Sequence, residues 1–254
     1  MSEAPAAIEA RGLRKEFTVG VRRTSLRRLL LSRGRVTRKV VEALRGMDLT
    51  VPRGEALGLI GRNGSGKTTL LGLIGRIYRP TAGELTVRGS VAPLLELGAG
   101  FHLELTGVEN IFLNGVILGL TRRQVAERME AIIEFAELRE FIDAPLRTYS
   151  VGMKMRLGFA VATHTDADII LVDEVLAVGD EGFQEKCYAR LEELRRAGRT
   201  LIVVSHEMPK IRRAAGRVIW LDRGRVHRDG PTEQIVDEYL AYSHAHPGLQ
   251  DSGP

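Results

Sequence analysis

Short apolar runs recur along this chain, and each predicts a strand. Three of them stand at Ala56–Ile60, Ile169–Val172 and Thr200–Val204. Runs of four or five residues are typical of parallel strands that are covered on both faces. Polar or glycine-rich residues follow each run, and ligands of parallel sheets bind beyond the carboxyl ends of the strands. The pattern therefore places candidate chemistry directly after the runs.

Other stretches alternate apolar and polar residues, which is the pattern of half-buried strands. Ile8–Val19 is expected to form an edge strand and Ala43–Val51 a second strand. Arg217–Leu221 and Arg225–Arg228 stand on either side of 222–224, which has the composition of a tight turn. This last pair predicts a hairpin near the end of the chain.

Helical periodicity dominates the middle of the chain. Thr121 and Gln124 have the spacing of a capping box, and an apolar stripe follows them at helical spacing. The stripe consists of Val125, Met129, Ile132, Ile133 and Ala136. Such a stripe is ordinary core packing, and we expect a mostly helical subdomain over 107–163. Shorter helices are expected at Thr69–Ile77, Lys154–Thr163 and Gln234–Ser243.

Alternating strands and helices predict an α/β fold with a mainly parallel sheet and helices on both faces. An antiparallel β part is expected near the N-terminus. The length of 254 residues, 44% hydrophobic and 27% charged, suits a single domain. Within it, 1–106 and 164–243 are expected to form the core with its N-terminal β part, and 244–254 a loose tail.

Composition excludes disulfide-rich, secreted and membrane-spanning proteins. Cys187 is the single cysteine, which excludes an internal disulfide framework and suits a reducing compartment. Met1–Ala10 lacks the basic and apolar regions of a secretory signal, and we find no apolar stretch of the roughly 18 residues that a membrane span needs. We expect a chain that stays in the cytoplasm and works at a membrane only through another chain.

Positive charge is concentrated in one stretch. Val21–Val40 carries eight arginine and lysine residues and no acid, although the whole chain has a net charge of only +5. The charge is therefore a local feature and not a general surface for polyanions. Aromatic residues make up only 5% of the chain, which argues against a base-stacking platform. Nucleic acid is not an expected partner.

The segment after the first run has the pattern of a phosphate-binding P-loop, with a strand before it and a helix after it. It consists of Gly61, Arg62, Asn63, Gly64, Ser65, Gly66, Lys67 and Thr68, and Thr69 follows. Glycines let backbone N–H groups turn toward phosphate oxygens, and a helix N-terminus favours negative charge. Lys67 is expected to reach the β- and γ-phosphates of ATP, and the Thr68 hydroxyl to bind Mg²⁺.

Carboxylates and a histidine follow the other two runs. Asp173 is expected to hold Mg²⁺, and Glu174 to orient the attacking water and accept its proton. On its own such a pair is equally consistent with a solvated loop, but the P-loop favours the catalytic interpretation. His206 is expected to contact the γ-phosphate. A lone histidine is more often a cap or a core residue, and the position of His206 at a strand end favours the catalytic role.

These motifs, with a turn at Tyr149–Met153 that offers a second helix N-terminus, resemble the nucleotide-binding subunits of ABC transporters. The resemblance covers Ile8–Tyr242. It identifies 61–68 as the Walker A motif, 169–174 as the Walker B motif and 149–153 as the signature motif.

The resemblance also implies further site residues. It implies nucleotide contacts for Tyr149, Ser150, Gly152, Asp180 in the D-loop, and Phe17, whose ring would stack on adenine. Glu96 occupies the position of the Q-loop glutamine and is a candidate metal contact, and Arg156 matches an arginine that usually follows the signature. The family architecture implies a head-to-tail homodimer, in which Ser150 and Gly152 of one copy complete the ATP site of the other.

Departures from the common family pattern agree with one subfamily. They lie at Glu96, in Gly98–Gly107, in the signature Tyr149–Met153 and in Val175–Asp180. Together they are similar to ATPases that export O-antigen, capsule and teichoic acid. This implies an ABC-2-type permease dimer as partner and a place at the cytoplasmic face of the inner or plasma membrane. Some members carry a C-terminal carbohydrate-binding domain, which we do not expect in a chain that ends at Pro254.

Val21–Val40 matches, in position, an insertion that this subfamily places near the membrane. Its arginines and leucines would contact anionic headgroups or a phosphate-bearing, lipid-linked glycan, and a solvated loop is an equal alternative. Two other functions stay open. One is an ABC subunit for another cargo, such as a lipid or a drug. The other is a soluble ABC-type regulator, which usually has paired ATPase domains or coiled-coil inserts that 254 residues do not hold.

Overall fold

The computed structural model describes residues 5–21, 37–94, 100–173 and 179–246, with the backbone alone at 19–21 and 37–38. Its framework is a six-stranded sheet. The strands are β3 (Ala56–Ile60), β5 (Val91–Leu94), β6 (Ile169–Val172), β7 (Thr200–Val204), β8 (Arg217–Asp222) and β9 (Arg225–Pro231). Their order is β5-β6-β7-β3-β8-β9, and all neighbours are parallel except the hairpin β8-β9. The predicted mainly parallel sheet and the terminal hairpin are confirmed.

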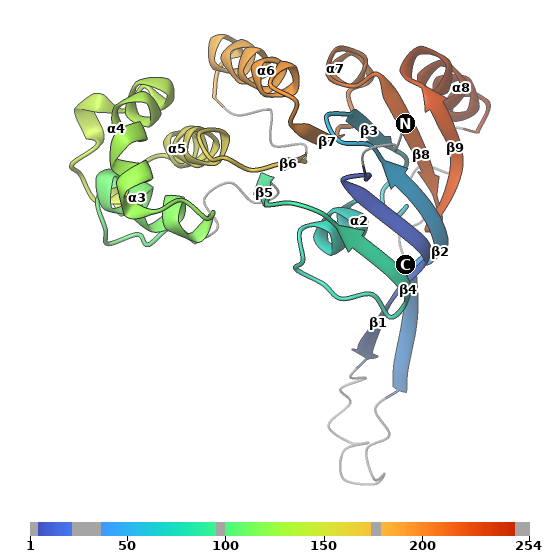
Figure 1. Ribbon diagram of the computed structural model, residues 1–254. Coiled ribbons are helices and arrows are strands. Elements are labelled where there is room, and N and C mark those ends of the chain that lie inside the picture. The colour runs from blue at the N-terminus through green and yellow to red at the C-terminus, as the bar shows by residue number, and fades with distance from the viewer. Residues whose placement is uncertain (1–4, 22–36, 95–99, 174–178, 247–254) are drawn as a thin grey trace, which may run out of the picture.

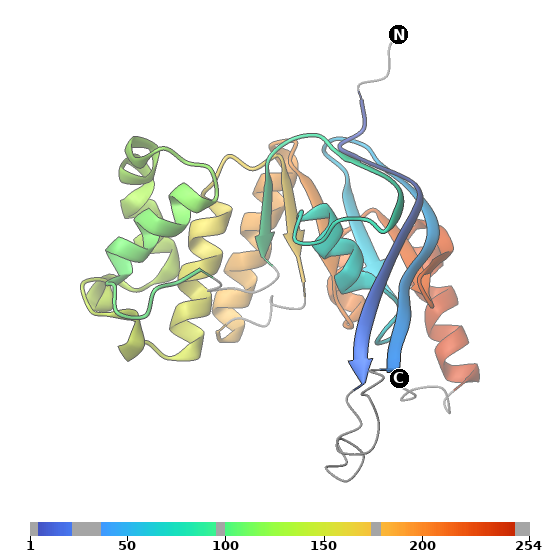
Figure 2. The same cartoon turned by 90° about the horizontal axis from the view of Figure 1, so that it is seen from below.

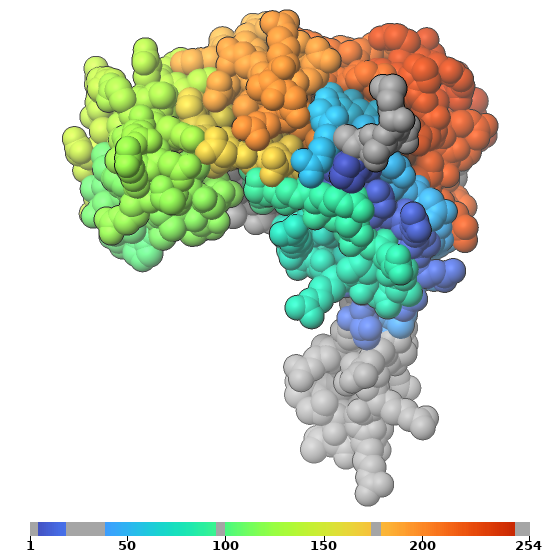
Figure 3. Space-filling view, in the orientation of Figure 1, coloured from blue at the N-terminus to red at the C-terminus, as the bar shows by residue number. Residues whose placement is uncertain are grey.

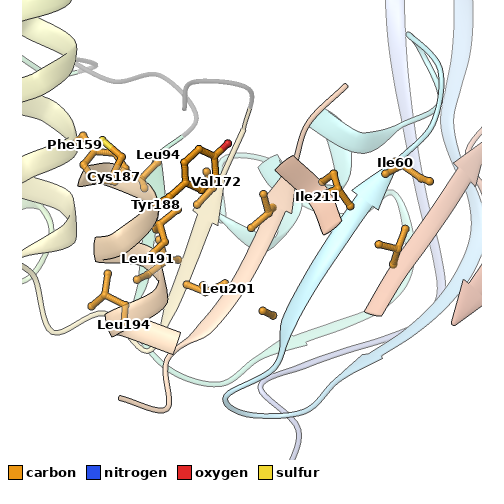
Figure 4. Packing of buried hydrophobic residues seen from close by; sticks show 14 of the residues in the cluster. Ile60, Leu94, Phe159, Val172, Cys187, Tyr188, Leu191, Leu194, Leu201 and Ile211 are labelled. Carbon is orange, nitrogen blue, oxygen red and sulfur yellow. The ribbon is translucent and has the colours of Figure 1, made fainter. Parts of the chain in front are cut away.

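Side chains of the central strands alternate between the two faces of this sheet. On β6, Ile169 and Leu171 pack toward α2 (Lys67–Ile74), whereas Ile170 and Val172 pack on the opposite face. That face is covered by α6 (Glu181–Arg196), α7 (Met208–Ala214) and α8 (Thr232–Ala245), as Figure 1 shows. Figure 4 shows Tyr188 and Leu191 of α6 beside Val172 of the sheet. Burial on both faces explains why these strands are uninterrupted apolar runs in the sequence.

A second sheet is antiparallel and lies on the α2 side of the molecule (Figure 1). It contains β1 (Ile8–Val21), β2 (Thr37–Val51) and β4 (Ala82–Val87), in the order β2-β1-β4. The prediction that Ile8–Val19 forms an edge strand is wrong, because β1 lies between two partners. None of the side chains of β4 is fully buried, so β4 has no apolar run that would reveal it in the sequence.

The first two strands are long and continue past the rest of the sheet (Figure 2). Their pairing continues to Val21 opposite Thr37. The ends of the basic stretch Val21–Val40 therefore lie side by side in adjacent strands. Residues 22–36, which hold most of its arginines, lie outside the described residues.

Three helices form a separate group with its own apolar core. They are α3 (Gly107–Ile117), α4 (Arg122–Ala136) and α5 (Val151–Thr163), and the short 3-10 turns Arg139–Phe141 and Leu146–Thr148 join α4 to α5. The capping box of Thr121 and Gln124 is present, and Thr106 and Glu109 form another at the start of α3. Figure 3 shows a hollow between this group and the antiparallel sheet.

The C-terminal helix α8 continues to Ala245, two residues into the stretch expected to be a loose tail, and 247–254 lie outside the described residues. Within the described part of the chain, no helix is both long and apolar enough to cross a bilayer. The division into core and helical subdomain at 107 and 163 stays a prediction.

Candidate active site

The P-loop joins β3 to α2 and presents the start of that helix. Gly66 is the N-cap residue of α2, with φ 108°, and no side chain caps the helix there. The first turn of α2 contains no acidic residue. The first N–H groups of a helix have no partner within the helix, and an anion is the ligand that such an end favours.

Two glycines of the loop are required by close packing. A Cβ at Gly61 would lie 2.2 Å from the carbonyl oxygen of Leu221, and a Cβ at Gly66 would lie 2.8 Å from that of Ala43. Both glycines also have positive φ. The loop is thus pressed against the end of β8 on one side and against β2 on the other.

Lys67 is buried beneath the loop. Its Nζ donates hydrogen bonds to the carbonyl oxygens of Gly61, at 2.7 Å, and Arg62, at 3.0 Å. Burial lowers the pKa of Lys67 to about 8, while the nearby Asp173 carboxylate acts in the opposite direction. The ammonium group is therefore held in place by carbonyls and is short of negative charge, which phosphate oxygens would supply.

Ser65 carries the clearest sign that the loop is built to bind a ligand. Its side chain is only 3% exposed, and its hydroxyl has no hydrogen-bond partner among the described residues. A buried polar group without a partner costs about 1–3 kcal/mol. Together with the uncapped start of α2 and the buried ammonium group, this hydroxyl fits a chain of phosphate groups lying in the loop.

Strand order brings the other predicted groups to the same place. Asp173 follows β6 and His206 follows β7, and these neighbouring parallel strands end beside β3 and its P-loop. Burial raises the pKa of Asp173, and the charges of Lys67 and His206 oppose that shift. Burial and then Lys67 lower the pKa of His206, while Asp173 raises it. The three side chains therefore lie close enough to act on one another's charge.

A groove collects most of the predicted nucleotide-binding residues. Those that line it are Phe17, Asn63, Gly64, Ser65, Gly66, Lys67, Thr68, Thr69, Asp173 and His206. Gly61, the first residue of the loop, is not among the lining residues, and its carbonyl accepts from Lys67. Phe17 lies at a distance in sequence from the P-loop, so its presence in the groove agrees with a role in holding the base.

Other groove features were not predicted. Tyr78 meets the Phe17 ring edge-on at 5.3 Å between centroids, and Lys15 Nζ lies 4.9 Å from the centre of the same ring. The backbone N–H of Gly224, in the β8-β9 turn, donates to the carbonyl oxygen of Ser65 at 2.9 Å. The sequence predicted the turn but carries no signal of its contact with the P-loop, because the two segments meet only in the folded chain.

The signature residues are placed elsewhere. None of the described groove-lining residues belongs to 149–153. Tyr149 is buried in the helical group, where its hydroxyl donates to the carbonyl oxygen of Phe141 at 2.6 Å. Ser150 is exposed, and its hydroxyl accepts from the N–H of Met153 at 3.1 Å to cap α5. The ring of Tyr149 can therefore position the motif, but it offers no surface to a nucleotide.

Gly152 and Asp180 also lie outside the groove-lining set. A Cβ at Gly152 would meet only Ser150 Oγ, at 3.9 Å, so the start of α5 is open on this side. Asp180 caps α6 by accepting from the N–H of Phe183 at 2.9 Å. Glu96 and Glu174 lie outside the described residues, and their roles stay predictions.

The donor set also bears on Mg²⁺. Among the described residues, no group of three His, Cys, Asp or Glu side chains is placed to hold a metal ion. Thr68 and Asp173 line the groove beside the loop. One hydroxyl and one carboxylate fit an ion such as Mg²⁺, which takes most of its oxygens from water and substrate phosphates.

Comparisons with known proteins agree with this geometry. A family model described as ABC transporter matches residues 44–177. The O-antigen export system ATP-binding protein RfbB of Myxococcus xanthus is 52% identical over 200 residues, which are 79% of this chain and 46% of that protein. The protein of the same name from Klebsiella pneumoniae is 50% identical over 197 residues, which are 78% of this chain and 80% of that protein.

A solved structure shows the fold. It is the dimeric structure of a post-hydrolysis state of the ATP-binding cassette MJ0796 bound to ADP and Pi, with a TM-score of 0.73 and 23% identity over 89% of this chain and 98% of that chain. The predicted α/β fold is thereby confirmed. On the match to the family model and to the Klebsiella protein, the chain belongs to the ABC transporter family.

Proposed function

We propose that this chain binds and hydrolyses ATP and so powers the export of a lipid-linked cell-envelope polysaccharide through a separate membrane permease. The observation that carries the ATPase role is the groove, where the uncapped start of α2, the buried Lys67 and the unpartnered Ser65 hydroxyl meet Asp173 and His206. The cargo rests on the names of the relatives and on the departures at Glu96 and Tyr149–Met153.

The residues of the groove have distinct roles in this proposal. The N–H groups at the start of α2 and the Lys67 ammonium bind the β- and γ-phosphates, Ser65 donates to a phosphate oxygen, and Phe17 stacks on adenine. Thr68 and Asp173 would hold Mg²⁺, which when bound would supply positive charge to the phosphate oxygens.

Hydrolysis then needs a base that activates water and a group that stabilises the charge on the γ-phosphate. Glu174 takes a proton from water as the water oxygen bonds to the γ-phosphorus. The bond from that phosphorus to the oxygen retained by ADP breaks, and the charge that develops on the γ-oxygens is stabilised by Lys67 and His206. ADP and phosphate leave, and the proton passes from Glu174 to solvent.

A second copy of the chain completes the site. Ser150 and Gly152 lie at an open surface, and the neighbouring Val151 is 71% exposed. Since none of the three lines the groove of its own chain, we infer that they close over ATP held by the partner copy in a head-to-tail homodimer.

The membrane partner is inferred to be an ABC-2-type permease dimer, which places the chain at the cytoplasmic face of the inner or plasma membrane. The relatives carry the names of export-system ATP-binding proteins. The basic stretch Val21–Val40 is then available for anionic headgroups or for the phosphate of the lipid-linked glycan.

Depletion tests the cargo most directly. We expect a lipid-linked polymer to accumulate inside cells when the chain is depleted, and wild-type protein to restore its export. Glu174→Gln should not restore it, whereas Arg123→Ala should, because the Arg123 side chain is 89% exposed on α4, where it pairs with Glu127. Accumulation of a different lipid would point to another cargo, and unchanged export after depletion would overturn the proposal.

A further inference from the structure

We propose that Arg156 is a positioning residue that locks Ser150 and Asp180 of one copy into a single rigid surface facing the ATP of the other copy. This inference rests on the two-copy site of the proposed function. It adds a residue that touches no nucleotide and assigns it a task at the partner's site and not at its own.

Arg156 stands at the junction of three helices. It lies on α5, and its guanidinium pairs with Glu137 Oε2 at 3.0 Å and with Asp180 Oδ2 at 2.9 Å. The Arg156 side chain is only 18% exposed. Its partners are more open, with the Glu137 side chain 49% and the Asp180 side chain 70% exposed, so the guanidinium is the buried member of both pairs.

The guanidinium also fits a slot in the packing. It lies 4.7 Å from the centre of the Phe183 ring, and a Cβ at Gly179 would come within 3.1 Å of its Nε. Gly179 has φ 71°, a conformation that favours glycine. A planar, forked cation satisfies both carboxylates and the ring at once, whereas lysine has neither the plane nor the fork.

A second cation closes the network. Lys186, on α6, donates to Glu137 Oε1 at 3.0 Å, and its Nζ lies 4.9 Å from the centre of the Phe135 ring. Glu137 ends α4 in the left-handed conformation. Alternating charges at Asp180, Arg156, Glu137 and Lys186 thereby fasten the end of α4, the body of α5 and the start of α6 to one another.

The network holds two exposed helix starts at a fixed separation. Ser150 caps α5, and Asp180 caps α6 with one carboxylate oxygen while the other accepts from Arg156. Neither residue lines the groove of its own chain. Loss of Arg156 should therefore let the two starts move independently, and the damage should appear at the ATP bound by the partner.

Dimers of one wild-type copy and one altered copy distinguish the ATP site of each copy. Wild-type and Arg156→Gln copies with tags of different size would be paired, loaded with a non-hydrolysable azido-ATP, washed and photolabelled. We expect the label on the wild-type copy to fall about tenfold, since its site is closed by the altered surface and loses charged hydrogen bonds. The Arg156→Gln copy should keep its label, because an intact surface closes its site.

Three further variants serve as the control and as additional tests in the photolabelling experiment. Arg123→Ala, which removes an exposed ion pair of α4, should leave both copies labelled equally. Arg156→Lys should resemble Arg156→Gln, because it restores charge without the fork. Asp180→Asn keeps a good N-cap residue and removes the charge that pairs with Arg156, so it should reproduce the pattern even if Arg156→Gln folds poorly.

The outcomes distinguish this inference from the function beneath it. If wild-type copies never pair in ATP, the two-copy site falls, and the role of Arg156 falls with it. If wild-type copies pair but the Arg156→Gln copy loses its own label, or both copies lose label equally, the two-copy site stands and the positioning role is wrong.

Discussion

Lys67 is held in an unfavourable environment until a ligand arrives. Burial lowers its pKa to about 8, and its two hydrogen bonds go to neutral carbonyl oxygens of the loop. A phosphate chain would bring negative charge against the ammonium and raise the pKa again. Binding of ATP is therefore coupled to the protonation of this one side chain.

The coupling predicts a pH dependence of ATP affinity. Affinity should change little below pH about 8, where Lys67 is already protonated, and should weaken above that value by up to about tenfold per pH unit, until the higher pKa of the complex is reached. Titration with a fluorescent ATP analogue measures this. Lys67→Arg stays charged and should show weaker binding without the fall. An affinity of the wild type that stays flat well above pH 8 would contradict the account.

For Ser65 we predict that a substitution at a buried side chain raises the free energy of unfolding, which is unusual. Because its buried hydroxyl has no partner among the described residues, Ser65→Ala should raise the free energy of unfolding without nucleotide by about 1 kcal/mol. The same change should weaken ATP binding. Ser205→Ala is the matched control, since the Ser205 hydroxyl accepts from the N–H of Glu207 at 3.1 Å and its loss should destabilise the chain. Denaturant unfolding with and without ATP checks both signs.

At the scale of elements, burial decided what could be predicted from the sequence. The bounds of β3, β6 and β7 were predicted as they stand, because strands buried on both faces are uninterrupted apolar runs. The strand β4 was missed because none of its side chains is fully buried and only Leu85 and Val87 pack on the core, and β5 because it contains Pro93. Proline is tolerated there because β5 is the edge of its sheet, with β6 as its one neighbour.

The candidate site divides in the same way. Its P-loop, Asp173 and His206 follow apolar runs, and parallel strands bring their ends together, so a local pattern was sufficient. The contacts of Tyr78 with Phe17 and of Gly224 with the P-loop join segments distant in sequence. No periodic pattern of apolar residues predicts such contacts.

The β8-β9 turn provides a test at this scale. A Cβ at Gly224 would lie 2.6 Å from the carbonyl oxygen of Ala43, whereas Gly198, with a nearly equal φ, has nothing within 4 Å. Both substitutions to alanine should cost about 1 kcal/mol through backbone strain. Gly224→Ala should in addition weaken ATP binding about tenfold, because the clash pushes the turn from the Ser65 carbonyl that it braces. Equal ATP affinity of the two variants would show that the turn does not support the loop.

At the scale of the whole molecule, the groups that the resemblance assigned to one nucleotide lie on two separate surfaces. The P-loop, Asp173 and His206 line the groove, while Ser150 and Gly152 lie at the open start of α5, in the helical group set apart in Figure 3. In the proposed site, one copy would therefore hold the nucleotide without enclosing it. In the proposed ATPase cycle, ATP binding brings two copies together and hydrolysis lets them separate.

Sedimentation of the Glu174→Gln variant with and without ATP tests this central claim most directly, since the substitution removes the proposed base and leaves the groove intact. We predict a monomer without nucleotide and a dimer with ATP, and a monomer under both conditions when Lys67→Ala is added. A Glu174→Gln chain that binds ATP, as shown by a fluorescent analogue, and still sediments as a monomer at every concentration would contradict the two-copy site.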